Sequence, residues 1–254
     1  MYAELLELAK KVGHGAGALL MERPPAFEIE SKSTAIDIAT QMDKKAEKFI
    51  VDSLLAARPH DGIIGEEGSA IVGSSGITWV IDPLDGTVNY FYGLPGWNVS
   101  IAARDEEGSV VGVVTAPTIN STWWATRGGG AFYNGHRIHC NEPIAVDRAL
   151  IATGFQYDVA HRTAQLDDLV KLVPVARDVR RNGAAAVDLC HVAMGALDAY
   201  YEAGLKEWDW AAGGLVATEA GATFAQYGSD PLRTTVAAGP TLHARITALL
   251  GFTA

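Results

Sequence analysis

An apolar run that ends in two acids is the most informative feature of this chain: residues 79–87 read WVIDPLDGT. The run predicts a strand that delivers Asp82 to its end, and Pro83 stiffens the turn that follows. Asp85 comes three residues after Asp82, a spacing that places both carboxylates on one side of a turn or of a first helical turn. Two converging carboxylates repel each other unless a cation lies between them.

Carboxylate oxygens of this kind suit Mg²⁺, which completes its coordination with water and substrate oxygens. Gly86 and Thr87 are expected to open a helix whose free N–H groups form a phosphate site beside the metal. The alternative is an ordinary turn in which Asp85 caps a short helix. Taken alone, the motif favours that turn by about two to one.

Two further acidic segments change this balance. Glu66 and Glu67 stand between glycines, and because neighbouring side chains of an extended chain diverge, one of the two is expected to reach a metal. A solvated loop is the alternative interpretation of that segment. Asp209 lies between two tryptophans where a helix is expected to open, and a purely structural role as the N-cap is about equally good there.

Composition limits the classes of partner. The 254 residues, 48% of them hydrophobic, suffice for one large domain or two closely packed lobes. Lys and Arg total 20 against 30 Asp and Glu, and a net charge of −10 argues against nucleic acid or an anionic membrane as partner. An anionic substrate would need a local cation, for which a bound metal is the simplest source.

The compartment is also predicted. Cys140 and Cys190 are too few for a disulfide framework, which favours a reducing cytoplasm. The N-terminal MYAELLELAKK mixes charges among leucines and lacks the apolar core of a signal peptide. No apolar stretch reaches the roughly 20 residues of a membrane span. We therefore expect a soluble cytoplasmic protein.

Periodicity places the motifs on elements. Apolar residues at helical spacing predict a helix through Leu5–Leu19 and a second from Asp37 to Ala57. The middle of the chain predicts short strands and a hairpin at Asn134-Gly135, which favours an antiparallel sheet. The predicted strands and hairpin cover residues 77–81, 98–103, 110–114, 122–125 and 131–139.

Beyond about residue 145, strands at 149–153 and 197–201 alternate with helices at 184–194 and 210–220, the last of these stopped by Gly221. This order predicts a layered α/β or α+β protein. We expect a single domain with sub-lobes at about 1–145 and 146–254 that close one core. The basic pair Arg180-Arg181 is interpreted as solvated or as part of a dimer interface.

Together the acidic segments resemble the inositol monophosphatase family, the lithium-sensitive, Mg²⁺-dependent branch of the fructose-bisphosphatase-like sugar phosphatases. Asp82–Thr87 followed by Asn89 is similar to its first signature, Trp208–Gly213 to its second, and Gly65–Glu67 precedes them as the family requires. The likeness runs through most of the chain in the family's order. It includes Lys32-Ser33 with Asp37, Thr40 and Asp43, then residues 183–185 and 198–202.

The resemblance implies a layered αβαβα sandwich, a homodimer and a site for two or three Mg²⁺ ions. The implied ligands of the first ion are Glu66, Asp82 and the backbone carbonyl of Leu84. Those of the second are Asp82, Asp85 and Asp209. Glu66 would also help to hold a third, weaker ion beside the loop that carries Lys32.

The same resemblance implies how the substrate is held. Thr87 would orient the attacking water, with Asp43 holding the Thr87 hydroxyl and Glu66 completing the catalytic group. The amides of Gly86 and Thr87 would hold phosphate oxygens. The hydroxyls of the leaving alcohol would be contacted by Asp85, by the backbone at Ala185 and by Glu202.

The predicted function is therefore Mg²⁺-dependent hydrolysis of myo-inositol monophosphate or a similar polyol phosphate by direct attack of metal-activated water. Glu202 favours a polyol because a carboxylate accepts hydrogen bonds from ring hydroxyls. Li⁺ is the expected inhibitor. Histidinol phosphate, fructose 1,6-bisphosphate and adenosine 3′,5′-bisphosphate remain alternative substrates, and a non-catalytic regulatory protein on the same fold remains the alternative class.

Overall fold

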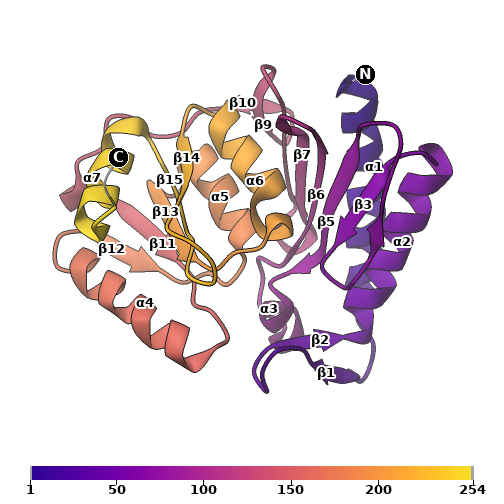
Figure 1. Ribbon diagram of the computed structural model, residues 1–254, viewed down its shortest axis with the longest axis horizontal. Helices are drawn as coiled ribbons and strands as arrows, with labels where there is room; N and C mark the ends of the chain where they lie inside the picture. The colour runs from indigo at the N-terminus through magenta and orange to yellow at the C-terminus, as the bar shows by residue number, and fades with distance from the viewer. Residues whose placement is uncertain (1, 253–254) are drawn as a thin grey trace.

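Five layers of helices and sheets stack in the computed structural model, which describes residues 2–252 (Figure 1). Two outer helices cover an eight-stranded sheet, two central helices separate it from a five-stranded sheet, and two more helices cover the far side. The αβαβα sandwich predicted from the sequence is confirmed. In layer order the helices are α1 (Tyr2–Met21) and α2 (Gln41–Ala57), then α5 (Ala185–Ala193) and α6 (Glu207–Glu219), then α4 (Val159–Leu172) and α7 (Pro240–Leu250).

The larger sheet has the strand order β10-β9-β8-β7-β6-β5-β3-β4 and is antiparallel except where β3 pairs with β5. The predicted antiparallel strands and the hairpin are confirmed, with Asn134 and Gly135 at φ of 46° and 88° in its turn. The strands are β3 (Gly62–Gly65), β4 (Ala70–Ile71), β5 (Thr78–Asp85), β6 (Asn98–Asp105), β7 (Gly108–Ala116), β8 (Ser121–Thr126), β9 (Gly130–Tyr133) and β10 (His136–Ile138).

The smaller sheet has the order β12-β11-β13-β15-β14, with β11 parallel to both of its neighbours. Its strands are β11 (Leu150–Thr153), β12 (Asp178–Arg180), β13 (Ala199–Ala203), β14 (Thr223–Tyr227) and β15 (Thr234–Ala238). The short elements are the hairpin β1 (Ile29–Ser31) and β2 (Ile38–Thr40), the helix α3 (Thr87–Tyr92), and 3₁₀ turns at Pro117–Ile119 and Val146–Arg148.

The second helix begins later than its periodicity predicts. Residues 38–40 pair with β1 as strand β2, and the helix α2 starts at Gln41. Thr40 is its N-cap: the Thr40 hydroxyl oxygen accepts a hydrogen bond from the amide of Met42 at 3.1 Å. The Asp43 carboxylate accepts one from the amide of Thr40 at 2.8 Å. This reciprocal capping ends the strand and fixes the direction of the Asp43 side chain.

The central layer is built from small residues that let helices and sheets approach closely. A side-chain carbon at Gly112 of β7 would lie 2.6 Å from the carbonyl oxygen of Ala212 in α6, so only glycine allows this contact. Alanines of α5 and α6 fill the space between the sheets. The two sheets therefore share this layer, and the loops at their ends meet around one pocket. Within residues 2–252, no helix is long and apolar enough to cross a bilayer.

Candidate active site

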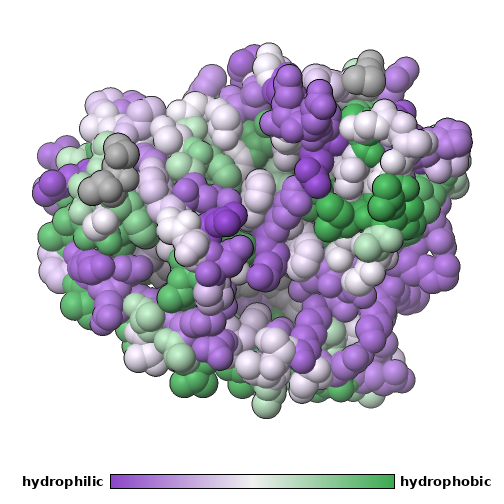
Figure 2. All heavy atoms as spheres, in the orientation of Figure 1, coloured by the Kyte–Doolittle hydropathy of each residue, from purple (hydrophilic) through white to green (hydrophobic). Residues whose placement is uncertain are grey.

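A cavity of about 490 Å³ opens where the ends of both sheets and the N-termini of α5 and α6 meet. Segments far apart in the sequence line it: the β1–β2 arm, the end of β5, the start of α3, and the residues flanking β13. Figure 2 shows hydrophilic residues around a hollow near the centre of this face. All the residues of the predicted site except Asp43 line this cavity, and Asp43 contacts the lining residue Thr87.

The two acids of the first motif lie within a strand rather than in a turn. The strand β5 extends to Asp85, but its pairing with β6 is irregular between Asp82 and Asp85. Pro83, which has no N–H to give to the ladder, lies in this irregular stretch. The turn expected here is therefore replaced by a bulge, a feature that re-aims side chains. The Asp82 carboxylate accepts a hydrogen bond from the amide of Leu84 at 3.0 Å.

Asp85 joins the two halves of the molecule. One carboxylate oxygen, Oδ1, accepts from the amide of Ala185 at 3.2 Å. The other, Oδ2, accepts from the amide of Ala186 and from Nδ2 of Asn98, each at 2.8 Å. A carboxylate has about four acceptor positions, so Oδ1 keeps one for another ligand. Burial raises the pKa of Asp85 to about 6, and the bonds from Asn98 and Ala186 oppose that rise.

Thr87 begins α3 and faces Asp43. The Thr87 hydroxyl oxygen lies 2.9 Å from Oδ1 of Asp43 and 3.0 Å from the carbonyl oxygen of Leu84, and its single proton can be donated to one of them at a time. Burial raises the pKa of Asp43, while hydrogen bonds from Thr40 and Thr87 oppose that rise. Gly86 precedes the helix with φ of 85°, a conformation that L side chains rarely adopt. The helix expected to open at Gly86 and Thr87 is confirmed.

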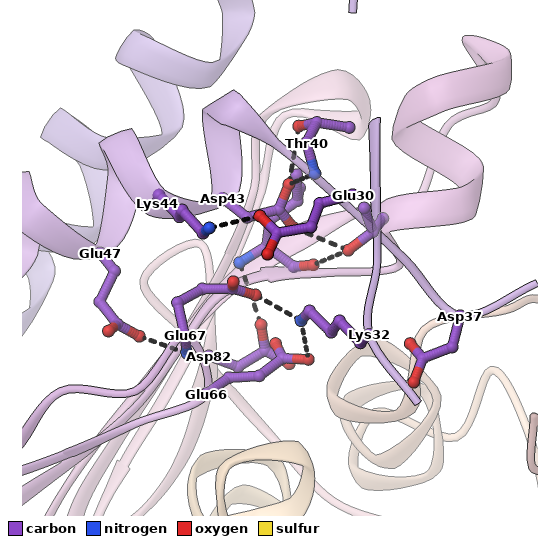
Figure 3. Close-up of polar contacts among 12 residues, drawn as sticks. Glu30, Lys32, Asp37, Thr40, Asp43, Lys44, Glu47, Glu66, Glu67 and Asp82 are labelled. Atoms are coloured by element: carbon purple, nitrogen blue, oxygen red, sulfur yellow. Dashed lines mark hydrogen bonds and ion pairs between the residues drawn. The ribbon is translucent and has the colours of Figure 1, made fainter. Parts of the chain in front are cut away.

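Glu66 follows β3 and contacts the β1–β2 arm through Lys32. The Lys32 ammonium lies 2.8 Å from Oε1 of Glu66 and also pairs with Glu67 (Figure 3). Burial of Lys32 opposes its charge, but the two glutamates outweigh that effect and raise its pKa. The two neighbouring glutamates thus share one ammonium, and of the two only Glu66 lines the cavity.

Asp209 lies in the first turn of α6 but is not its N-cap, the structural role that the sequence left open. The N-cap is Lys206, and the Asp209 carboxylate accepts a hydrogen bond from its amide at 2.6 Å. Desolvation raises the pKa of Asp209 well above its usual value, and the charge of Glu66 adds to the rise. The pKa of Asp82 is raised in the same way, first by desolvation and then by the charges of Glu66, Asp85 and Asp209.

The donor chemistry of the pocket fits a hard divalent cation. Its acids offer carboxylate oxygens, and Leu84 offers a backbone carbonyl. Desolvation and then mutual repulsion raise the pKa of Asp82, and a cation would relieve that repulsion. Across residues 2–252, no three acidic, imidazole or thiol side chains stand in a ready-formed metal group. Oε1 of Glu66 bonds to Lys32, and its other carboxylate oxygen makes no bond to that ammonium.

Glu202 marks the end of the cavity that β13 lines. The Tyr200 hydroxyl donates a hydrogen bond to Oε2 of Glu202 at 2.5 Å. Burial raises the pKa of Glu202 to about 7, opposed by the bond from Tyr200 and by the charge of Arg181. The carboxyl group therefore changes charge near neutral pH, at the wall of the pocket.

The structure adds residues that the sequence interpretation missed. Asn98 orients Asp85, and Asp188 is a buried acid in the lining that accepts a hydrogen bond from Asn182 at 2.6 Å. Burial raises the pKa of Asp188 to about 8. Arg181, interpreted from the sequence as a solvated or interface residue, is exposed but also lines the cavity. The available signal was that Arg181 lies two residues before the segment 183–185, which resembles the family.

Comparison with known proteins covers the whole described chain. The model of the inositol monophosphatase family matches residues 1–252. An inositol-1-monophosphatase of Mycobacterium leprae is 43% identical over 76% of this chain and 70% of its own length. The Nus factor SuhB of Escherichia coli is 39% identical over 85% of this chain and 83% of its own.

Solved structures share the fold. The extragenic suppressor protein SuhB of Bartonella henselae superposes with a TM-score of 0.92 at 32% identity, covering 97% of this chain and 98% of its own. SuhB of Mycobacterium tuberculosis superposes with a TM-score of 0.85 at 38% identity, covering 98% and 96%.

Proposed function

This chain belongs to the inositol monophosphatase family and is a phosphatase, and we propose that it hydrolyses myo-inositol monophosphate or a closely similar polyol phosphate with the help of Mg²⁺. The observation that carries the proposal is the gathering of Glu66, Asp82, Asp85 and Asp209 in one cavity with Thr87 and Glu202. We further propose that the chain is a single domain of two sub-lobes, acts as a cytoplasmic homodimer, and is inhibited by Li⁺.

Two sets of donors would hold the metals. Glu66, Asp82 and the Leu84 carbonyl would hold one ion, and Asp82, Asp85 and Asp209 would hold the other; Glu66 would also contribute to a third, weaker one. When bound, Mg²⁺ supplies Lewis acidity that lowers the pKa of a water and offsets the charge of the departing alkoxide. Asp85 supports this assignment because one acceptor position of Oδ1 remains available.

The chain's own groups would orient the attacking water. When the Thr87 hydroxyl donates its proton to Asp43, its oxygen presents lone pairs that accept a hydrogen bond from the water. Asp43 thereby directs the Thr87 proton away from the water and keeps a Thr87 lone pair available to it, and Glu66 lines the same cavity. The amides of Gly86 and Thr87 are proposed to hold the phosphate oxygens of the substrate.

The leaving alcohol would lie toward β13. Glu202 would accept hydrogen bonds from ring hydroxyls. Asp85 and the backbone of Ala185, which are hydrogen-bonded to each other, also line the cavity and would contact further hydroxyls. Hydroxyl recognition of this kind favours a polyol. The cavity is also lined by a cation, Arg181, and an acid, Asp188, which suit a substrate with a charged leaving group. Histidinol phosphate, fructose 1,6-bisphosphate and adenosine 3′,5′-bisphosphate are therefore alternative substrates.

A regulatory role is a second candidate, because the similar protein of Escherichia coli carries the name Nus factor. The acids of the cavity favour turnover over a purely non-catalytic role, since a protein that only binds partners does not need them.

Phosphate release with Mg²⁺ tests the proposal. We expect Asp82→Asn to lower the rate by at least about 10²-fold, because the substitution weakens both proposed ions at once. Asp52→Asn, an exposed acid of α2 that pairs with Lys48, is the matched control and should keep the wild-type rate. Equal rates for wild type and Asp82→Asn would refute a metal-dependent phosphatase at this site. Ranking kcat/KM over inositol, sugar, histidinol and nucleotide phosphates identifies the substrate.

A further inference from the structure

Glu47 is a buried acid that the proposed reaction does not use. It lies one helical turn after Asp43 on α2 and is only 4% exposed. Its carboxylate makes no ion pair within residues 2–252, although Lys44 and Lys48 are on the same helix. A buried carboxylate without a cation needs hydrogen-bond donors to offset its desolvation, and the donors it has point to its role.

Both oxygens of Glu47 bind the backbone of the acidic loop. Oε2 accepts from the amide of Glu67 at 2.8 Å, and Oε1 accepts from the amide of Ser69 at 3.0 Å. Figure 3 shows the Glu47 carboxylate reaching the Glu67 backbone from α2. These two amides flank Gly68, which has φ of 108°, so the carboxylate spans the turn that follows β3.

Gly65, on the other side of Glu66, also packs against this carboxylate. A side-chain carbon at Gly65 would lie 2.4 Å from Oε2 of Glu47, which makes glycine necessary for the close approach. The Glu66 amide donates to the carbonyl oxygen of Ile81 at 3.2 Å and joins the same segment to β5. The backbone is therefore held at Gly65, at Glu66 and at Glu67, which limits the directions that the Glu66 side chain can take.

One face of α2 thus secures two separate parts of the cavity. Residues four apart on a helix lie on the same side. Asp43 contacts the Thr87 hydroxyl at 2.9 Å, and Glu47 holds the loop that carries Glu66. Because both acids belong to one rigid helix, the distance between the water-orienting hydroxyl and the proposed metal ligand is set by α2.

We propose that Glu47 is a positioning residue for the metal ligand Glu66, acting through the amides of Glu67 and Ser69. This inference rests on the proposed function, because it takes Glu66 to be a ligand. Groups that orient metal ligands from behind change metal affinity by about 10- to 100-fold when they are removed. Metal affinity is therefore the property that Glu47 controls.

Binding of Mn²⁺ to the full-length protein, measured as free ion by electron paramagnetic resonance, tests the proposal without relying on turnover. Glu47→Gln places an amide NH₂ against one of the two backbone N–H groups. Glu47→Asp keeps the charge but is one methylene shorter, so it cannot span both amides. The control is Glu219→Gln, because Glu219 accepts hydrogen bonds from the amides of Gly128 and Gly130 at 2.7 and 2.8 Å in a turn outside the cavity.

We expect Glu47→Gln and Glu47→Asp each to raise the Mn²⁺ dissociation constant about 10-fold, and Glu219→Gln to leave it within twofold of wild type. Activity of the two Glu47 variants should recover at high Mg²⁺ concentration, because mass action fills a site of lower affinity. Wild-type affinity in Glu47→Asp with weak binding in Glu47→Gln would show that only the charge matters and would overturn the proposal.

The remaining outcomes are also decisive. Wild-type affinity in both Glu47 variants overturns the proposal, and so does failure of both to fold, since Glu47 would then be a residue of the core and not of the site. A wild-type protein that binds no Mn²⁺ contradicts the proposed function itself, a result distinct from a change confined to the Glu47 variants.

Discussion

Three of the four acids proposed as metal ligands are held by a backbone amide as well as by burial. Asp82 accepts from Leu84, Asp85 from the start of α5, and Asp209 from Lys206. These bonds fix the direction of each carboxylate before any ion arrives. Desolvation and mutual repulsion act in the opposite sense and raise the pKa values. The site therefore lowers the stability of the protein in the absence of metal but has its geometry set in advance, as is common for functional sites.

Asp188 offers a test of the cost of a buried acid that is separate from the proposed metal ligands. Its pKa is about 8 in the folded protein and 3.8 in the unfolded reference, so the folded state binds the proton more tightly. The contribution of Asp188 to stability must then fall as the pH rises from about 4 to 8. Asn cannot ionise and can still accept from Asn182, so we expect Asp188→Asn to match the wild-type Tm near pH 4 and to exceed it increasingly up to pH 8.

Thermal melting between pH 4 and 8 in chelator checks this expectation. Asp178→Asn, at an exposed acid that pairs with Arg180, is the control and should show no growing advantage with pH. A Tm difference for Asp188→Asn that stays constant over the range would mean that Asp188 ionises normally in the folded protein.

At the scale of elements, the start of α2 and the bulge in β5 do most to shape the site. Thr40 ends a strand and begins a helix in one residue, which turns Asp43 toward Thr87. The irregularity after Asp82 lets one strand present two acids to one cavity, although residues three apart in a regular strand face opposite sides. Local backbone chemistry thus sets the angles between site residues.

Replacing the N-cap should therefore affect both stability and turnover. We expect Thr40→Ala to lower the free energy of unfolding by about 1 kcal/mol through loss of the cap. It should also lower kcat more than it raises KM, because Asp43 loses the Thr40 hydroxyl that helps to orient it. Urea unfolding and steady-state kinetics measure the two effects.

Thr163→Ala is the control for this prediction. Its hydroxyl donates within α4 to the carbonyl oxygen of Val159 and takes no part in the Asp158 cap of that helix. The prediction fails if Thr40→Ala and Thr163→Ala change stability and kcat to the same extent.

At the scale of the whole molecule, the central helical layer sets the distance between the two halves of the site. Asp82 and Asp85 belong to the larger sheet, whereas Asp209 and Ala185 are carried by α6 and α5. The contact of Gly112 with Ala212 brings α6 against β7, close enough for Asp209 to influence the pKa of Asp82. A change in the thickness of this layer would move one set of proposed ligands relative to the other.

Gly112→Ala tests this dependence on thickness. The added methyl group meets the backbone of Ala212, so we expect a loss of about 1–3 kcal/mol in unfolding free energy. We also expect weaker Mn²⁺ binding, because α6 must shift with Asp209. Gly17→Ala on α1 is the control, since its nearest neighbour would be 3.5 Å away and alanine favours a helix. Unchanged Mn²⁺ affinity in a folded Gly112→Ala protein would contradict the expectation.

The sequence alone predicted many of the helices and strands and the acids proposed as metal ligands. The helical stripe of α1, the strands of the larger sheet and the Asn134-Gly135 turn all depend on local periodicity and turn chemistry, which are readable without a structure. Resemblance to a family supplied the αβαβα order and the grouping of the acids, since no local rule states which distant segments meet.

Only the tertiary structure decided how the site is assembled. Residues 38–40 became a strand because β1 lies beside them, and Asp209 is not an N-cap because Lys206 takes that place. In the sequence Glu47 is surrounded by lysines and resembles an exposed acid, yet it is buried against a loop twenty residues away. The reason is physical: a hydrogen bond between separate segments depends on how layers pack, and packing is a property of the whole chain rather than of any short stretch.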